Sequence, residues 1–435
     1  MYVCGAEHMT RNADALQVRA YRNLNELKNL APAWEGLLSV YPLATTFCTR
    51  EWLSAWWRAF GGDRELLVLG FFAENSELVG LAPLSVERQP LGAGPSLRLM
   101  RLMGDGSGDS DNLDMPVRPG WEQPVTLALL ECLRTQAPRW DVCAFNVMNP
   151  DSPVAKCLLD HLRIEKWPVF TSTLPWSVIC LPETWDSYLK MLSSKERGKL
   201  GTRTRRLEKR YKINFRKCAQ ETKLPKDLEV LFELHGKRWR VRGEPGSFVS
   251  AERRSFYQDI ASSLLKRGLL EFWFLEVDDK AVATLFGFRY GSTVFSLQEG
   301  YDPAFSSDSV GYILRGHVLK QLICAGVRRY DFLAGRDESK ERWCAQVGHY
   351  IGLHFAKPFS LGSAYLRSVH RARTSKEWLR SRLPQPAWHA LHRIKLMLGL
   401  KPNSAPVLRT ASPVENPPGK EDPDEALGEK RGNTR

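Results

Sequence analysis

The chain lacks the features that identify several large classes of protein. No apolar run approaches the roughly 18 residues that a membrane-spanning helix needs, and residues 1–12 show no apolar core of a secretory signal. The nine cysteines include no C-x-x-C pair, so they predict neither a zinc cluster nor a disulfide framework. Reduced thiols of this kind are typical of a cytoplasmic protein, which is what we expect.

Signature motifs of common enzymes are also missing. The sequence has no G-x-x-x-x-G-K-[ST], no G-x-S-x-G and no H-E-x-x-H, so the usual P-loop, serine-hydrolase and zinc-protease templates have no support. The aspartate-rich stretch 105–114 does not fit an EF-hand loop started at Asp109. Its sixth position is Asp114 rather than glycine, and its twelfth is Gly120 rather than glutamate. We expect a structural loop there and predict no metal site.

The chain does have enough apolar sequence for a substantial core, and it has an excess of positive charge. Its 435 residues are 43% hydrophobic and 10% aromatic, which excludes a mostly disordered chain. Lys and Arg number 62 against 49 Asp and Glu, which gives a formal net charge of +13 at pH 7. Such a balance suits an anionic partner: a nucleic acid, a phosphorylated cofactor or an acidic membrane surface.

One order of elements occurs twice along the chain. The first half shows strand-like runs at 65–72, 78–86 and 97–103, a loop, a helix at 121–136 and a strand at 141–148. The second half repeats this order with strands at 271–277, 281–290 and 292–298, a loop, a helix at 310–325 and a strand at 329–333. The two copies are offset by about 200 residues, which indicates a duplicated domain. We therefore predict an α/β fold with mixed sheets flanked by helices.

Basic segments lie between and after the two copies. Residues 191–217 carry eleven Lys or Arg and two acids, which predicts a basic helix that is solvated, faces phosphates or contacts nucleic acid. Residues 361–401 carry nine basic residues and one acid among Leu, Trp and Ile, typical of helices at an anionic membrane surface or packed on the body. From Pro402 onward, six prolines and mixed charges predict a disordered tail.

The sharpest candidate site is the loop 300–311, between a predicted strand and a predicted helix. A helix start exposes unpaired N–H groups and about half a positive charge, which favours an anion such as a diphosphate. Because Gly311 has no side chain, it would let the diphosphate approach the backbone of Val310 and Gly311. Ser309 would cap the helix or donate a hydrogen bond. An ordinary N-cap after a turn is the alternative.

A second cluster lies at the end of a predicted helix. His235, Arg238, Trp239 and Arg242 share one side of it, because they are spaced by three, four and seven residues. This face suits an anionic or sugar-like acceptor, although a single histidine in such a place is often structural.

A third cluster follows a strand end, where α/β folds place their ligands. Asp337 or Glu338 would take a proton from an acceptor, and Lys340 would hold a negative group of the acceptor or support a carboxylate. A salt-bridged surface loop is the alternative.

Taken in order, these segments resemble the CelD/BcsL family of GNAT-type acetyltransferases, whose relatives include FemAB-like proteins built from two GNAT domains. The resemblance covers about residues 15–357. It is carried by the aromatic helix from Phe47 to Gly61, the basic segment ending in Arg205-Arg206-Leu207-Glu208, His235 with Arg238-Trp239 and Arg242-Gly243, the GYDP-x-F loop with Ser309 and Gly311, and YDFL-x-G with Lys340 and Trp343. It implies tandem GNAT units, an acyl-CoA donor and a role in exopolysaccharide or cellulose-type biosynthesis.

The repeat and the resemblance together predict the organisation of the chain. We expect an N-terminal extension over 1–14, a first GNAT-like domain over 15–180 and a second, acetyltransferase domain over 181–360. A basic helical extension over 361–401 and the tail over 402–435 would follow.

The implied chemistry is transfer of an acetyl group from acetyl-CoA to an amine or hydroxyl of a sugar-like acceptor. Ser309, Val310 and Gly311 are expected to hold the diphosphate, and a backbone N–H between Gln298 and Gly300 the thioester oxygen. Asp337 is the leading candidate for the base, with Glu299 second. The residues expected to bind the acceptor are His235, Arg238, Trp239, Arg242 and Lys340.

Two alternatives stay open. The first is a FemAB-like transferase that uses aminoacyl-tRNA, with residues 195–217 meeting its phosphates. The second is a non-catalytic scaffold of a polysaccharide-synthesis complex at the inner membrane, with 361–401 as its contact.

Overall fold

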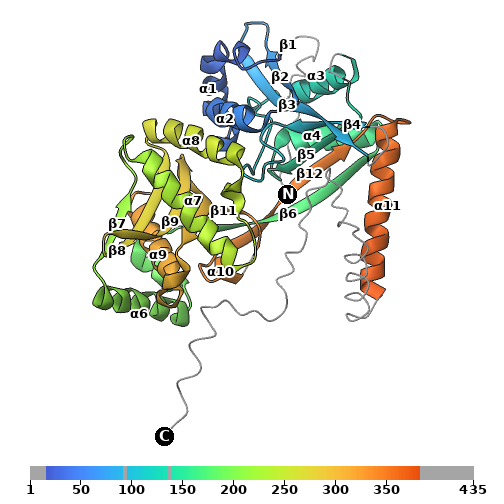
Figure 1. The fold of residues 1–435 in the computed structure, drawn as a ribbon. Helices are drawn as coiled ribbons and strands as arrows, with labels where there is room; N and C mark the ends of the chain where they lie inside the picture. The colour runs from blue at the N-terminus through green and yellow to red at the C-terminus, as the bar shows by residue number, and fades with distance from the viewer. Residues whose placement is uncertain (1–15, 92–95, 136–138, 337, 383–435) are drawn as a thin grey trace, which may run out of the picture. The chain divides into compact units, whose positions relative to one another are not determined.

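The structure is a computed structural model of the chain, and it describes residues 16–91, 96–135, 139–336 and 338–382. The chain divides into two compact units (Figure 1). In its described parts, unit 1 takes residues 16–50, 63–174 and 350–382, and unit 2 takes residues 51–62 and 175–349. The chain passes from unit 1 to unit 2 within strand β6 (Val169–Cys180) and returns within β12 (Gln346–Phe355).

Unit 1 is built on strands that lie in the order β1, β2, β3, β4, β5 and β12. Neighbours are antiparallel except β4 and β5, which are parallel. The strands are β1 (Gln17–Tyr21), β2 (Glu65–Phe72), β3 (Leu78–Pro90), β4 (Ser96–Leu102) and β5 (Val142–Met148), and the helices are α1 (Ala31–Val40), α3 (Glu122–Thr135), α4 (Pro153–Ile164) and α11 (Leu361–Arg382).

Unit 2 repeats this pattern with strands in the order β6, β11, β10, β9, β8 and β7. The parallel pair here is β10 and β11. Its strands are β7 (Ile213–Lys217), β8 (Leu270–Val277), β9 (Lys280–Tyr290), β10 (Thr293–Tyr301) and β11 (Arg329–Ala334); its helices are α2 (Arg50–Phe60), α5 (Trp185–Met191), α6 (Ser194–Arg210), α7 (Leu224–Val241), α8 (Ala251–Lys266), α9 (Val310–Cys324) and α10 (Glu338–Glu341).

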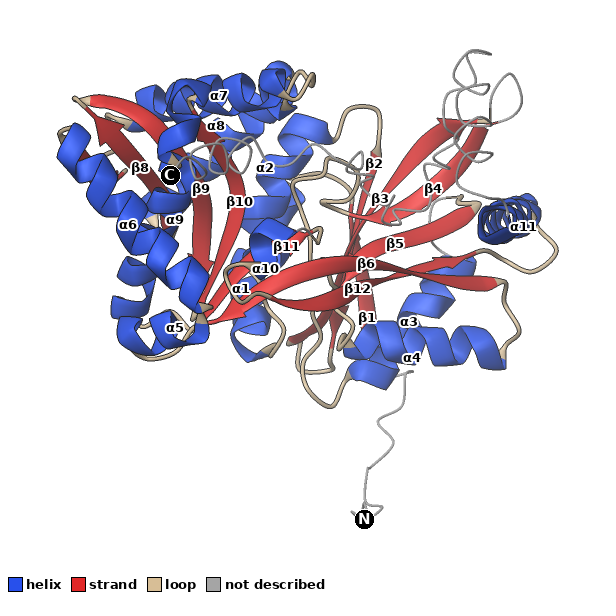
Figure 2. Cartoon of the chain, turned by 90° about the horizontal axis from the view of Figure 1, so that it is seen from below, coloured by secondary structure: helices blue, strands red, loops and turns tan. Residues whose placement is uncertain are grey.

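Alternation along β9 gives the unit 2 sheet two covered faces. Ala283 and Leu285 belong to the apolar cluster that α9 shares, whereas Phe286 and Phe288 contact rings of α8 and α2. Side chains two residues apart lie on the same face of a strand, so this pattern requires helices on both sides. Figure 2 shows α6 and α9, and α7 and α8, around strands β8 to β10.

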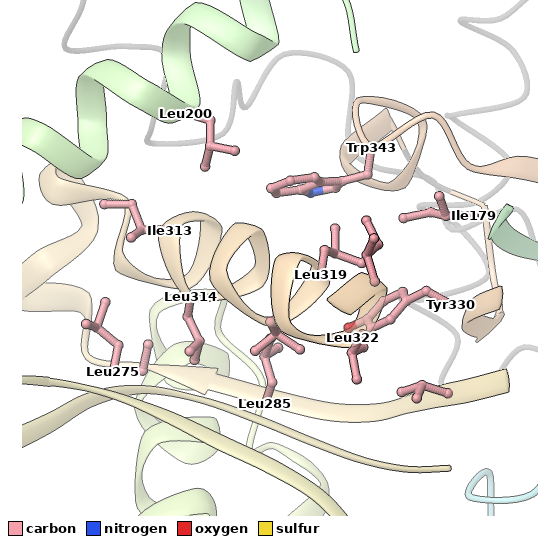
Figure 3. Packing of buried hydrophobic residues seen from close by; sticks show 14 of the residues in the cluster. Ile179, Leu200, Leu275, Leu285, Ile313, Leu314, Leu319, Leu322, Tyr330 and Trp343 are labelled. Carbon is pink, nitrogen blue, oxygen red and sulfur yellow. The ribbon is translucent and has the colours of Figure 1, made fainter. Parts of the chain in front are cut away.

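Helix α9 lies between the sheet and α6 (Figure 3). Leu314 is fully buried on the side of the sheet and Leu319 on the side of Trp343, and Leu200 of α6 covers the helix from outside. A Cβ at Gly316 would come within 2.6 Å of the Leu200 side chain, so the glycine permits this close approach. Helix α9 is therefore held firmly on both sides.

Glycine sets the packing of α7 on the opposite face as well. A Cβ at Gly300 in β10 would lie 2.5 Å from the backbone nitrogen of His235 and 2.7 Å from the carbonyl carbon of Leu234. Backbone atoms cannot yield to such a contact, so only glycine lets α7 rest on this part of β10.

The predicted elements of both copies are present, and the predicted mixed α/β fold class is confirmed. Asp278 and Asp279 occupy the predicted turn with φ of 49° and 64°, the left-handed conformation of a tight hairpin. The single basic helix expected within 191–217 is wrong in extent. It ends at Arg210, and residues 213–217 form β7, because Ile213 and Phe215 point to the apolar cluster while the strand pairs with β8.

In the part of the chain that the structure describes, no helix is both long enough and apolar enough to cross a membrane. The extension predicted over 1–14, the tail over 402–435 and most of 383–401 lie outside the described residues.

Candidate functional site

The parallel strands β10 and β11 separate after a short paired stretch. They pair from Thr293 with Arg329 to Phe295 with Asp331, and no further pair joins them among the described residues. Beyond Ser296 the register of β10 against β9 shifts, and Gln298 to Tyr301 pair with β9 alone. The edge of β10 that faces β11 therefore has no strand partner over Gln298–Tyr301, which suits it to bind a carbonyl oxygen of a ligand.

A 3-10 helix over Pro303–Asp308 leads from this segment to α9, and the side chain just before α9 lacks a hydrogen-bond partner in the described chain. Ser309 precedes the helix in a left-handed conformation, with φ of 56° and ψ of 41°, and its side chain does not cap the helix. The residue is 5% exposed, and within the described chain its Oγ has no hydrogen-bond partner. A strained backbone, an unpartnered buried hydroxyl and a helix N-terminus thus coincide, which suits an anionic ligand.

Val310 and Gly311 complete this turn. Val310 is 1% exposed and belongs to the apolar cluster under the helix, whereas Gly311 is half-buried. A Cβ at Gly311 would meet its nearest neighbour, the Tyr301 ring, at 3.7 Å, an ordinary contact. The glycine is therefore not required by the packing around it.

Cations of α6 lie beside the first turns of α9. Lys199 Nζ and the Arg203 guanidinium lie 5.4 Å and 5.7 Å from the ring of Tyr312. Arg210 forms an ion pair with Asp308, the buried residue just before Ser309. The charge of α6 therefore adds to that of the α9 N-terminus, and both favour a phosphorylated ligand.

Glu299 lies between two arginines at the separated strands. Its Oε1 is 2.7 Å from Nη1 of Arg238 in α7, and its Oε2 pairs with Nη2 of Arg315 in α9. The side chain of Arg315 is 9% exposed and that of Glu299 33%. Both carboxylate oxygens pair with guanidinium groups, which holds the carboxylate between α7 and α9. This position argues against Glu299 as the base and for a role in setting charge.

His235 is buried under the site rather than facing it. It is 1% exposed, and its Nδ1 has no hydrogen-bond partner in the described chain. Burial, and then the neighbouring charges of Arg238 and Arg253, lower its pKa to about 4, although a hydrogen bond with the Gln298 side chain acts in the other direction. The ring is thus neutral at pH 7, and it joins α7 to β10 at Gln298. We therefore assign His235 a positioning role, in which it orients Gln298 and does not contact a ligand.

Trp239 and Arg242 form the more accessible part of the α7 end. Trp239 is half-buried, and the exposed Arg242 guanidinium lies 5.7 Å from its ring centre. An aromatic face beside an exposed cation is a suitable surface for a polar ring with an anionic substituent.

Lys340 organises the loop that follows β11. Its Nζ donates to the carbonyl oxygens of Ala334 at 3.1 Å and Gly335 at 3.0 Å. This arrangement assigns it to the loop backbone rather than to an acceptor. Asp337, the leading candidate for the base, lies outside the described residues, so its role stays a prediction.

The sequence analysis did not identify Arg315, which lies in the second turn of α9. It named Gly300 for its place in the loop and its backbone, but not as the residue on which α7 packs. The signal for Arg315 was an arginine among the apolar residues of a buried helix, because such a charge needs a carboxylate partner.

Comparisons with known proteins agree with this geometry. Residues 194–341 match the family model described as an acetyltransferase (GNAT) domain, and no curated protein matches the chain. The crystal structure of FemX is similar over 81% of this chain and 99% of that chain, with 12% identity and a TM-score of 0.56. L-PGS from Bacillus licheniformis (11% identity, 77% and 94% coverage, TM-score 0.45) and a tandem GNAT protein from the clavulanic acid biosynthesis pathway (11%, 79% and 99%, 0.39) are more distant.

The matched range contains β10, the loop after it, α9 and β11. Residues 194–341 form an acyltransferase domain of the GNAT type. This confirms the prediction of an enzyme, and the similarity to FemX supports the predicted tandem arrangement as a fold. Among the described residues of this domain and the rest of the chain, no three His, Cys, Asp or Glu side chains are arranged to hold a metal ion.

Proposed function

We propose that the chain transfers an acyl group, most simply acetyl, from coenzyme A to an amine or hydroxyl of a sugar-like acceptor in exopolysaccharide or cellulose-type biosynthesis. The start of α9 is the observation that supports coenzyme A as the donor. There the buried, unpartnered Oγ of Ser309 and the backbone amides of Val310 and Gly311 lie next to a strand edge without a partner.

The residues fit an acyl-CoA in two places. The amides at the α9 N-terminus and Ser309 would hold the diphosphate, with Lys199 and Arg203 adding positive charge beside it. The open edge of β10 over Gln298–Tyr301 would donate an N–H to the thioester oxygen, where negative charge develops during transfer.

The acceptor would bind on the α7 side. Trp239 and Arg242 offer an aromatic face and a cation, while the Arg238–Glu299–Arg315 group fixes the charge between donor and acceptor. Asp337 remains our candidate for the base that removes the acceptor proton. We expect pairing within the charge group to hold Arg238 in place, so that the acceptor meets a fixed surface.

A thermal-shift screen with acetyl-CoA tests the donor. A ligand at a hundred times its dissociation constant adds about 2.7 kcal/mol of stability, so a clear rise in melting temperature is expected. Gly311→Glu should abolish the rise, because it places a carboxylate against the diphosphate. Gly311→Ala is the matched control and should keep the rise, because a Cβ fits there. An equal rise in wild type and Gly311→Glu would remove this loop from the donor site.

Helix α6 supports a second candidate, transfer from an aminoacyl-tRNA. Besides Lys199 and Arg203, the helix exposes cations along its length. Those classed as exposed are Lys195, Arg197, Arg205, Arg206, Lys209 and Arg210. This array is longer than one coenzyme A molecule requires, and it suits a chain of phosphates.

Salt separates the two candidates. If the reaction depends on tRNA, its rate should fall steeply as the salt concentration rises. This dependence of rate on salt should be weaker in the variant Arg205→Ala/Arg206→Ala/Lys209→Ala, which removes three phosphate contacts. The same variant should leave the acetyl-CoA thermal shift unchanged if coenzyme A is the donor, because it keeps Lys199, Arg203 and Ser309. Product formation from acetyl-CoA without tRNA would exclude the second candidate.

A further inference from the structure

Helix α11 of unit 1 carries one exposed face that is rich in arginine. Its first turns pack on unit 1: Ser363 and Leu366 are 3% and 2% exposed, and the ring of His370 stacks on that of Phe170 with the ring centres 4.4 Å apart. The helix then continues to Arg382 at the periphery of unit 1 (Figure 1). The side of the helix that carries these residues therefore packs on this unit.

This exposed face is cationic and carries an aromatic ring. Arg367, Arg371, Trp378 and Arg382 are spaced by four, eleven and fifteen residues, which places them within about 60° of one another around a helix. All four are exposed, and Arg382 lies 5.4 Å from the ring centre of Trp378, which is itself 58% exposed. From Leu361 to Arg382 the sequence has six Lys or Arg and one acid, Glu377.

A second observation lies at the start of the same helix. Phe359 is 100% exposed and has a φ of 54°, a left-handed conformation that is costly for a residue with a side chain. Leu361, two residues later, is 53% exposed. A strained backbone that holds an aromatic ring entirely in solvent contributes nothing to the fold, so it indicates a partner that accepts the ring.

From this combination we infer that α11 and Phe359 form a docking surface for an anionic lipid bilayer. Arginines on one helix face complement phospholipid headgroups, and Trp, Phe and Leu side chains enter the boundary between headgroups and acyl chains. The exposed aliphatic side chain of Leu361 favours a bilayer over a nucleic acid, because a nucleic acid offers no apolar layer. The inference concerns where the enzyme works and does not depend on its donor or acceptor.

Vesicle flotation of the full chain tests the docking surface. The protein should float with phosphatidylcholine vesicles that contain phosphatidylglycerol, stay in the soluble fraction with phosphatidylcholine alone, and bind less as salt rises. Each cation near an anionic surface contributes about 1 kcal/mol, so Arg367→Ala/Arg371→Ala/Arg382→Ala should weaken binding roughly 100-fold. Phe359→Ser should also weaken it, with the salt dependence unchanged.

A charge-matched control separates location from net charge. Arg88→Ala/Arg163→Ala/Lys166→Ala removes the same charge from other exposed positions of unit 1 and should bind as wild type does. Circular dichroism and transfer to a soluble acceptor should be unchanged in all of these variants. Equal losses in both triple variants, equal binding to both kinds of vesicle, or loss of RNA binding in place of vesicle binding would each overturn the inference.

Discussion

Units 1 and 2 both contain a parallel strand pair that separates, but the two openings are used differently. In unit 1, β4 and β5 pair only from Leu99 with Val142 to Met100 with Cys143. The chain after β4 then returns to β5, where Leu113 bridges to Met148 and its N–H donates to the carbonyl of Val147 at 3.0 Å. In unit 2 no such return to β11 occurs in the described chain, and the loop leads directly into α9.

The polar groups near each opening differ in the same sense. In unit 1, Arg101 and Asp105 pair at 2.8 Å with side chains 6% and 0% exposed, and Asn146 donates to the same carboxylate. In unit 2, the carboxylate between the two arginines is 33% exposed, and the Oγ of Ser309 has no hydrogen-bond partner in the described chain. The aspartate-rich loop closes the first copy with its own hydrogen bonds, whereas the groups of the second copy are more exposed or lack a partner within the described chain. Under the proposed function, unit 1 is the structural half and unit 2 the catalytic half.

The largest expected effect follows from breaking the closed network. Asp105→Asn leaves the buried guanidinium of Arg101 with one fewer counter-charge, and loss of one partner of a buried ion pair costs about 3–5 kcal/mol. Urea unfolding should show this loss, while kcat/KM of the folded enzyme changes little.

Glu299→Gln is the matched substitution in unit 2. Its carboxylate is partly exposed, so we expect a loss of no more than about 2 kcal/mol. Transfer should fall about 100-fold, because the arginines that it positions lose their fixed arrangement. A stability loss equal to that of Asp105→Asn, with transfer intact, would erase the distinction between the two networks.

The second expected effect is a response to pH that has opposite signs in the two units. Burial raises the pKa of Asp114 in unit 1 from 3.8 to about 6, although hydrogen bonds from Ser152, Tyr41 and the Met115 N–H act against the rise. Its contribution to stability is therefore fully present below about pH 4 and is lost as pH rises through 6. The difference between folded and unfolded pKa corresponds to about 3 kcal/mol.

His235 in unit 2 behaves in the reverse way. Its pKa is lowered from 6.5 to about 4, so its contribution is present above pH 6.5 and is lost as pH falls through 4. The free energy of unfolding in urea should be measured between about pH 4 and pH 7. In Asp114→Asn it should no longer decrease towards neutral pH, and in His235→Gln it should no longer decrease towards acid pH. Identical pH profiles of both variants and wild type would contradict both assignments.

Much of this fold, and less of this site, could be predicted from the sequence. The strands of both copies follow from apolar runs bounded by turn residues such as Asp278-Asp279, because period and turn chemistry are local. The α9 N-terminus was also predicted, since a loop with Ser, Asp and Gly before an apolar helix is a local signal. The Glu299–Arg315 pair and the burial of His235 depend on how α7 and α9 pack against β10, and no local pattern encodes that packing.

The smallest expected effect compares two serines at helix starts. Ser152 in unit 1 donates to Asp114 at 2.6 Å and caps α4 by accepting from the Ala155 N–H, so Ser152→Ala should cost about 1–2 kcal/mol. Ser309→Ala removes a buried hydroxyl that has no partner, so the free protein should be as stable or slightly more stable. The same change should weaken acetyl-CoA about 10-fold in calorimetric titration, because one hydrogen bond to a charged group is lost.

Those opposite responses follow from where each hydroxyl finds its partner. Ser152 finds it inside the protein, so its removal is measured in unfolding and leaves acetyl-CoA binding as it was. Ser309 would find it only in a ligand, so its removal is measured in binding alone. Unfolding that is equally destabilised by both substitutions would mean that the Ser309 hydroxyl contributes to the fold, and the start of α9 would then lose its claim to be an open anion site.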